Sequence, residues 1–159
     1  MIRNPRMRGR VRPGNGHLYT CGLFAWAGNC QADGGFYRVR ATSQAPYLPI
    51  GLHAHTNGME IQFTDPLDPA SANTTTNYAV KVWSLKRSAN YGSPHLNEHP
   101  LSVTQATLAA DRKSVFLTVP DLQPTWSMEI QCRLRGANGR SFTRTVHNTI
   151  HRLGATRGD

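Results

Sequence analysis

Residues 58–68, with the sequence GMEIQFTDPLD, decide the fold class of this chain. Met59, Ile61 and Phe63 alternate with polar residues, which is the period-two pattern of a strand with one face in a core and one in water. Two Asp-Pro pairs follow directly, and they end the strand because proline donates no backbone hydrogen bond. We therefore predict a half-buried β-strand that stops at an Asp-Pro turn.

The same alternation recurs along the chain between turn signals. It predicts strands over 18–24, 35–42, 49–56, 58–64, 78–85, 101–108, 114–119, 126–134 and 141–153. The most regular inward face is formed by Trp126, Met128, Ile130, Cys132 and Leu134. Short strands at such intervals predict an all-β protein, an immunoglobulin-like or fibronectin-like antiparallel β-sandwich with an extra N-terminal hairpin. A barrel is the alternative.

Composition divides the chain into four segments. We expect a disordered basic tail over 1–16, a hairpin over 17–45, the β-sandwich over 46–153 and a second disordered tail over 154–159. Within the sandwich, Asn57-Gly58 is the strongest hairpin-turn signal, because this pair tolerates a positive φ. The polar segment 69–77 has room for one helical turn.

The net charge of +9 raises the question of a nucleic-acid partner. Five of the 18 basic residues are arginines within the first twelve positions, which leaves 13 basic against nine acidic residues, only +4, in the remainder. A solvated arm is the simpler interpretation of this cluster, and nucleic-acid binding through the arm is an alternative. No apolar run approaches the roughly 20 residues that span a bilayer.

The three cysteines permit one disulfide at most. Cys21 and Cys30 could close a small loop in an oxidising compartment, and a free pair is the alternative. Cys132 is expected to be a buried strand residue.

Histidines supply the main candidate metal site. His53 and His55 share one face of a predicted strand, while His95 and His99 lie in the long polar loop 86–100, so a surface Zn²⁺ or Cu²⁺ site is possible. Solvent-facing histidines are the simpler interpretation, because no cysteine or acidic partner falls at ligand spacing. Ser93 lacks a nucleophile-elbow motif. No catalytic residue and no cofactor is predicted.

Aromatic residues supply the candidate contact positions. Trp83 and Trp126 fall on alternating strands and are expected in the core. Trp26 lies in the loop of the N-terminal hairpin, where it could contact a sugar or a protein partner. Tyr91 is expected to anchor a tight turn and is a second candidate contact. Asp65 and Asp68 are expected to cap the turn after the opening strand, with calcium binding as the alternative.

A set of motifs spread over residues 17–153 points to a known family. They are HLYTC, GLFAWAGNCQADGGFYRVR, PIGLHAHTNGMEIQFTDPLDP, YAVKVWSLKRSANYGSP, LAADRKSVFLTVPDLQP and HNTIHRL. As a set they resemble the C-terminal part of secreted sorbosone-type sugar dehydrogenase-like, haem-binding proteins of planctomycete bacteria. The resemblance implies the last hairpin of a β-propeller followed by an immunoglobulin-like module, in a periplasmic or extracellular setting. The chain departs from that family in having no Cys-x-x-Cys-His haem attachment motif.

These observations favour a non-catalytic accessory module that contacts protein or carbohydrate, with another protein or domain docking on the N-terminal hairpin. A small metal-binding protein or enzyme using the four histidines is the first alternative. Nucleic-acid binding through the arginine arm is the second.

Overall fold

The computed structural model describes residues 6–23 and 34–158 of the chain. Its backbone is all-β, with three antiparallel sheets, one short α-helix and one 3-10 helix, η1 (Thr75–Asn77), in the described part. It divides into two compact units, Met1–Gln44 and Ala45–Asp159.

The first unit is a three-stranded sheet of order β1-β2-β3, formed by β1 (Arg6–Val11), β2 (Leu18–Leu23) and β3 (Gly34–Val39). The predicted hairpin corresponds to β2 and β3, which pair from Leu18↔Val39 to Leu23↔Gly34. The expectation of a disordered tail over 1–16 is wrong for 6–11, because β1 pairs with β2. Backbone hydrogen bonds hold this strand while Arg8 and Arg10 stay exposed, so counting apolar residues cannot detect it.

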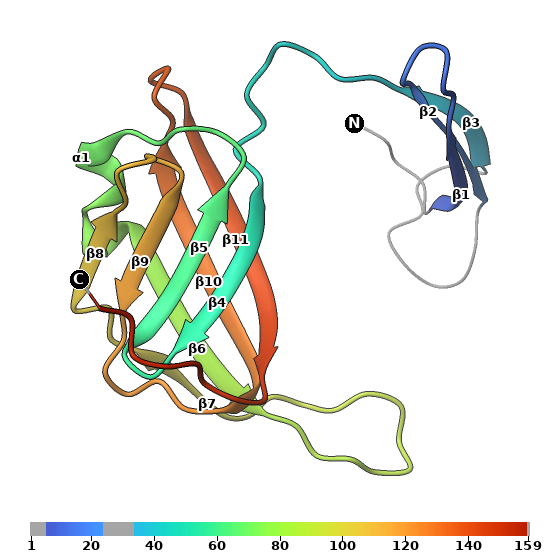
Figure 1. Ribbon diagram of the computed structural model, residues 1–159. Coiled ribbons are helices and arrows are strands. Elements are labelled where there is room, and N and C mark those ends of the chain that lie inside the picture. Colours follow the sequence, from blue (N-terminus) through green and yellow to red (C-terminus); the bar gives the residue numbers. More distant parts are fainter. Residues whose placement is uncertain (1–5, 24–33, 159) are drawn as a thin grey trace. The chain divides into compact units, whose positions relative to one another are not determined.

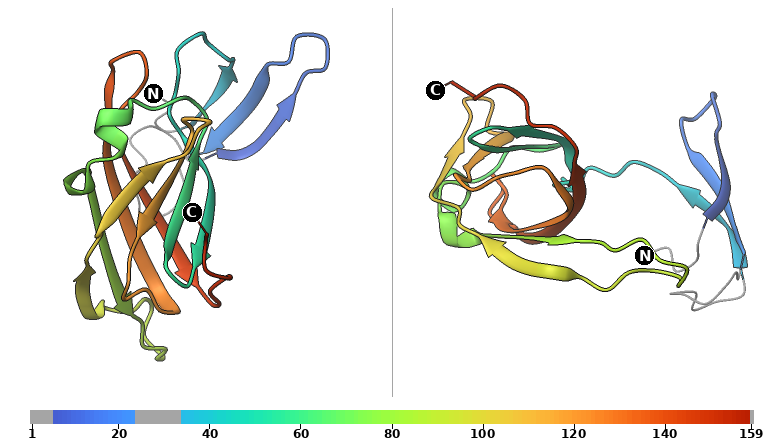
Figure 2. Two further views of the ribbon diagram at one scale, coloured as in Figure 1. Left: turned by 60° about the vertical axis from the view of Figure 1, so that its left-hand side comes forward. Right: turned by 90° about the horizontal axis from the view of Figure 1, so that it is seen from below.

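The second unit is a β-sandwich of two four-stranded sheets (Figures 1 and 2). One sheet has the order β4-β5-β9-β8, with β4 (Pro49–His55), β5 (Gly58–Phe63), β9 (Ser114–Thr118) and β8 (Gln105–Leu108). The other has the order β11-β10-β6-β7, with β11 (Ser141–Ile150), β10 (Thr125–Arg135), β6 (Tyr78–Ser84) and β7 (Leu96–Leu101).

The core lies between these two sheets and is built from the predicted inward faces. Met59, Ile61 and Phe63 of β5 are fully buried, as the opening stretch predicts. From the facing sheet come the alternate residues Tyr78, Val80, Val82, Met128, Ile130, Cys132 and Leu134, all buried. Period-two burial on both sheets confirms the predicted all-β sandwich.

The β4–β5 hairpin forms as predicted, but its turn lies one residue earlier than Asn57-Gly58. His55 pairs with Gly58, so the two turn residues are Thr56 and Asn57. Gly58 is instead the first residue of β5, where a Cβ atom would lie 2.0 Å from the carbonyl oxygen of Leu117 on β9. Close approach of two backbones therefore requires glycine at this position.

The acidic residues after β5 act as caps, as expected. Asp68 is the N-cap of the short helix α1 (Pro69–Ala72), and its Oδ2 accepts a hydrogen bond from the Ser71 amide at 3.0 Å. Asp65 Oδ2 accepts the Tyr47 amide at 3.0 Å, which ties the start of this unit to the end of β5.

The predicted strand over 101–108 is two strands in different sheets. β7 ends at Leu101 beside β6, and β8 begins at Gln105 beside β9. The apolar residues move from the odd positions Leu101 and Val103 to the even positions Ala106 and Leu108 at this crossing, and the prediction of a single strand overlooked that break in the alternation. As a result, His99 lies in β7 and not in the predicted loop.

The expectation of a disordered tail over 154–159 is also wrong for the described residues 154–158. The Thr56 amide donates to the Gly154 carbonyl at 3.2 Å, and Asn57 exchanges hydrogen bonds of 3.0 Å with the backbone of Arg157. Arg157 Nη1 lies 3.0 Å from Glu60 Oε1, and its guanidinium carbon lies 5.1 Å from the centre of the Phe116 ring. Polar contacts hold this segment, so it has no apolar signature.

Candidate binding site

The β6–β7 loop, residues 85–95, projects from one end of the sandwich (Figure 1). A hollow of about 510 Å³ lies against this loop. We name it the Trp126 hollow. Its lining residues are Leu85, Lys86, Arg87, Ser88, Asn90, Gly92, Ser93 and Trp126. The volume falls within the roughly 300–1,000 Å³ that is usual for small-ligand sites. The lining combines an indole with hydroxyl, amide and cationic groups.

Trp126 reaches this hollow because its strand is irregular. The β10–β11 pairing shifts register between Thr125 and Met128, so Trp126 does not continue the inward face of β10. Its side chain is 53% exposed, and its carbonyl accepts a hydrogen bond of 2.8 Å from Thr149 Oγ1. The expectation that Trp126 belongs to the core is therefore wrong, although Met128 and the alternate residues after it are buried.

Ser93 joins the two arms of the β6–β7 loop. Its hydroxyl oxygen accepts the Lys86 amide at 2.9 Å and donates to the Pro94 carbonyl at 3.0 Å. Gly92 beside it has φ +82°, a backbone conformation that glycine adopts readily. Tyr91 is fully exposed, so the expectation that it anchors the turn is wrong. The serine does this, and Tyr91 is left free to contact a ligand or partner.

The base of the loop is fixed against Trp83. The His95 imidazole stacks on this indole, with ring centroids 4.1 Å apart and planes inclined by 17°. His147 contacts the same indole edge-on at 6.4 Å, and Lys81 Nζ lies 5.5 Å from its centre. Trp83 is buried as predicted, but it lies on the side of β6 opposite Val82 and is covered by polar residues, not by the core.

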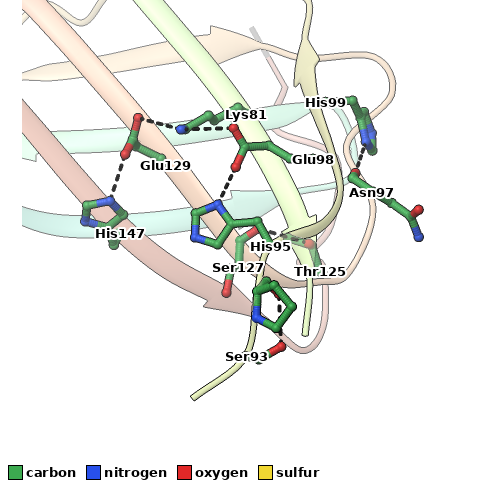
Figure 3. Close-up of polar contacts among 11 residues, drawn as sticks. Lys81, Ser93, His95, Asn97, Glu98, His99, Thr125, Ser127, Glu129 and His147 are labelled. Atoms are coloured by element: carbon green, nitrogen blue, oxygen red, sulfur yellow. Dashed lines mark hydrogen bonds and ion pairs between the residues drawn. The ribbon is translucent and has the colours of Figure 1, made fainter. Parts of the chain in front are cut away.

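A row of charged side chains continues from His95 across the outer face of the sheet (Figure 3). Glu98 contacts His95 and Lys81, and Lys81 also lies 3.7 Å from Glu129. Glu129 Oε2 in turn lies 2.9 Å from His147 Nε2. Hydrogen bonds from His95 and then Lys81 lower the pKa of Glu98, while the bond to Glu98 raises the pKa of Lys81. The row thus holds the C-terminal arm of the loop at neutral pH.

A second hollow of about 210 Å³ shares Trp126 with the first. It is lined by Pro124, Thr125, Trp126, Thr149, Ile150 and His151. The tryptophan therefore borders both hollows.

The four histidines of the predicted metal site are not brought together. His53 and His55 lie on β4, whereas His95 and His99 lie in or beside β7 of the other sheet. His55 Nδ1 is 2.8 Å from the Ala155 carbonyl oxygen, and His99 Nδ1 is 2.8 Å from that of Asn97. Among the residues that the structure describes, no three His, Cys, Asp or Glu side chains form a group that could hold a metal ion.

Two other predicted features fall partly or wholly outside the described residues. Trp26 and Cys30 both lie within 24–33, outside the described residues. The contact role of Trp26 and the disulfide between Cys21 and Cys30 therefore stay predictions. Cys21 is exposed on β2, and Cys132 is buried. Burial raises the pKa of the Cys132 thiol to about 12.

The sequence contained only part of the signal for the Trp126 hollow. The long polar loop over 86–100 was a recognisable functional candidate, because loops of this length are uncommon in compact domains. The register shift that turns Trp126 outward has no counterpart in the residue pattern, which alternates without interruption from Trp126 to Leu134.

No helix in the described ranges 6–23 and 34–158 is long and apolar enough to cross a membrane. Comparisons with protein-family models, with curated proteins and with solved structures each found no match to this chain. The site therefore has to be interpreted from its own geometry.

Proposed function

We propose that the β-sandwich is a non-catalytic, immunoglobulin-like accessory module that binds carbohydrate at the Trp126 hollow. The observation that carries the proposal is an exposed indole at a hollow of about 510 Å³ whose lining also offers hydroxyl and amide groups. The apolar face of a pyranose ring packs on an indole, and its hydroxyls require hydrogen-bonding partners, which the Ser88 and Asn90 side chains can supply.

The strand order supports an immunoglobulin-like description of the sandwich. In that fold one sheet has the order A-B-E-D and the other contains C, F and G, with C′ beside C in the longer variants. Lettering β4 to β11 in chain order as A, B, C, C′, D, E, F and G converts the two sheets to A-B-E-D and G-F-C-C′. The Trp126 hollow then lies between the C–C′ loop and the start of strand F.

The site is positioned in a way that suits binding. The hollow is formed by a loop that is fixed at its base by the His95–Trp83 stack and across its arms by Ser93. Such anchoring reduces the conformational entropy that ordering the loop around a ligand would otherwise cost. A sugar could therefore bind to a largely preformed surface.

A protein partner for the N-terminal unit is the second part of the proposal. Phe36 on β3 is 75% exposed and stacks on Tyr19 of β2 with centroids 5.8 Å apart. An aromatic ring as exposed as Phe36 on a small sheet is typical of a surface that another protein covers. The resemblance to sorbosone-type dehydrogenase-like proteins proposes a sugar-oxidising domain as that partner.

The test is a saccharide-binding panel on the full-length chain. We expect at least one oligosaccharide to bind, and its affinity to fall at least tenfold in Trp126→Ala. Ile50→Ala is the matched control, because Ile50 is similarly exposed, at 61% against 53% for Trp126, but lies on β4. The bound saccharide should be recovered chemically unchanged. Binding that Trp126→Ala leaves intact, or conversion of the saccharide, would contradict the proposal.

A further inference from the structure

We infer that the Trp126 hollow selects an acidic saccharide, one whose ring carries a carboxylate or a sulfate. This inference rests on the proposed function and names the ligand class. It starts from the charges of the lining, which includes two cationic residues, Lys86 and Arg87, and no acidic one. Both cations are exposed and lie next to each other at the start of the β6–β7 loop.

These two cations have no anionic partner within the described structure. The ion pairs seen among residues 6–23 and 34–158 involve Lys81, Arg157 and three histidines, but neither Lys86 nor Arg87. Lys81, on the outer face of the sheet, is different, because it lies within 4 Å of two carboxylates, those of Glu98 and Glu129. Lys86 and Arg87 therefore remain available for an anion that the ligand brings.

The arrangement of the lining matches the separate parts of an acidic sugar. The indole of Trp126 offers a flat apolar surface for the ring, and the Ser88 and Asn90 side chains can bond its hydroxyls. A guanidinium such as that of Arg87 forms paired hydrogen bonds with a carboxylate or sulfate, and the Lys86 ammonium adds a second charge. A neutral sugar would use only the indole and the polar side chains, and would leave both cations without a partner.

A single-stranded nucleic acid is the competing anionic ligand, and the lining favours it less. Proteins that bind single strands stack successive bases on several aromatic side chains along a basic groove. Here one indole is present in the hollow, and the other lining residues, which include Leu85, the two cations, two serines and one asparagine, add no second aromatic ring. One ring surface with polar surroundings suits one or two sugar rings better than a run of bases.

Calorimetric titration of the full-length protein with matched ligands tests the inference. Tetragalacturonate and its fully methyl-esterified form share one backbone and differ in whether each carboxyl group is a charged carboxylate or a neutral methyl ester, and a heparin tetrasaccharide adds sulfate groups. An octathymidylate is the nucleic-acid probe. We expect tetragalacturonate or the heparin tetrasaccharide to bind at least tenfold more tightly than the methyl ester, with an affinity that weakens as salt is raised.

Substitutions then assign the selectivity to the two cations. The double variant Lys86→Gln, Arg87→Gln should lose at least fivefold in affinity for the acidic ligand and keep its affinity for the methyl ester. The control Lys113→Gln, Arg140→Gln removes the same charge from turns at the other end of the sandwich and should bind as the wild type does. Circular dichroism checks that each variant is folded.

The possible failures are distinguishable. Equal affinity for the acid and its ester, or no effect of the double substitution, overturns the acidic selectivity, while loss of binding in Trp126→Ala would still support carbohydrate binding. Octathymidylate binding in the absence of saccharide binding overturns both proposals, and so does a lack of binding to every probe at millimolar concentration.

Discussion

The imidazole of His95 lies flat on the indole of Trp83, 4.1 Å between ring centroids, and connects the projecting β6–β7 loop to the outer face of the sheet. Glu98 contacts the same imidazole, and Lys81 lies 3.2 Å from Glu98, so the stack is also part of an ionic row. The loop that lines the candidate site is thereby held by residues outside the hollow. Ligand affinity should depend on this remote contact.

Removing the His95 ring should loosen the loop. We expect His95→Ala to increase amide exchange over residues 85–95 and to lower saccharide affinity about threefold, since an aromatic pair of this kind contributes roughly 0.5–1.5 kcal/mol. Hydrogen-exchange mass spectrometry measures the first effect and calorimetry the second. His99→Ala is the control, because that imidazole bonds the nearby Asn97 carbonyl and takes part in none of the ring stacks or ion pairs seen among the described residues. Equal exchange in both variants would contradict the role of His95.

The ionic row should make the loop sensitive to acid. Hydrogen bonds from His95 and Lys81 lower the pKa of Glu98 in the folded protein, so its contribution is present above the unfolded value of about 4.3. That contribution is lost as the pH falls through the lowered folded pKa. Melting temperatures between pH 6 and pH 2.5 should therefore fall less steeply for Glu98→Gln than for the wild type.

Asp121→Asn is the matched control for this titration. Asp121 takes part in none of the ion pairs seen among the described residues, so its substitution should leave the slope of melting temperature against pH unchanged. Parallel curves for wild type and Glu98→Gln would show that the row does not stabilise the fold.

Gly58 should tolerate no side chain. A Cβ atom at this position would lie 2.0 Å from the Leu117 carbonyl oxygen, which is backbone and cannot rotate away. We expect Gly58→Ala to lower the free energy of unfolding by about 3 kcal/mol, measured by urea denaturation. Gly158→Ala is the control, because no atom lies within 4 Å of its added Cβ, and it should change stability by less than about 0.5 kcal/mol.

The buried Cys132 thiol should be unreactive in the folded protein. Burial raises its pKa to about 12, against about 8.5 in an unfolded chain, so little thiolate forms at pH 8 and reagents cannot reach it. Iodoacetamide should label the Cys132 peptide only in guanidinium chloride, whereas exposed Cys21 should be labelled in the native state. Because only the unfolded thiol ionises between these two pKa values, stability should also fall as the pH rises through that interval. Native labelling of Cys132 would contradict its placement in the core.

By itself, the sequence determined the fold class and most of the core. Alternation of apolar and polar residues predicted β5, β6, β9 and β10, because side chains on successive strand residues point to opposite faces and only one face is buried. The cap at Asp68 was equally local, since its side chain bonds the Ser71 amide three residues away, whereas the Asp65 bond to the Tyr47 amide spans 18 residues. The alternation and the Asp68 cap need no knowledge of distant neighbours.

The tertiary structure alone decided where the candidate site lies. Trp126 leaves the core because β10 shifts register against β11, a property of the pair of strands and not of either sequence. His95 and Trp83 are twelve residues apart and meet only because the loop folds back, while His53 and His95 fall on different sheets. Strand β1 and residues 154–158 are held by hydrogen bonds to residues distant in the sequence. Such bonds produce no periodic pattern of apolar residues. Contacts of this kind follow from strand pairing, so residue patterns along one segment cannot predict them.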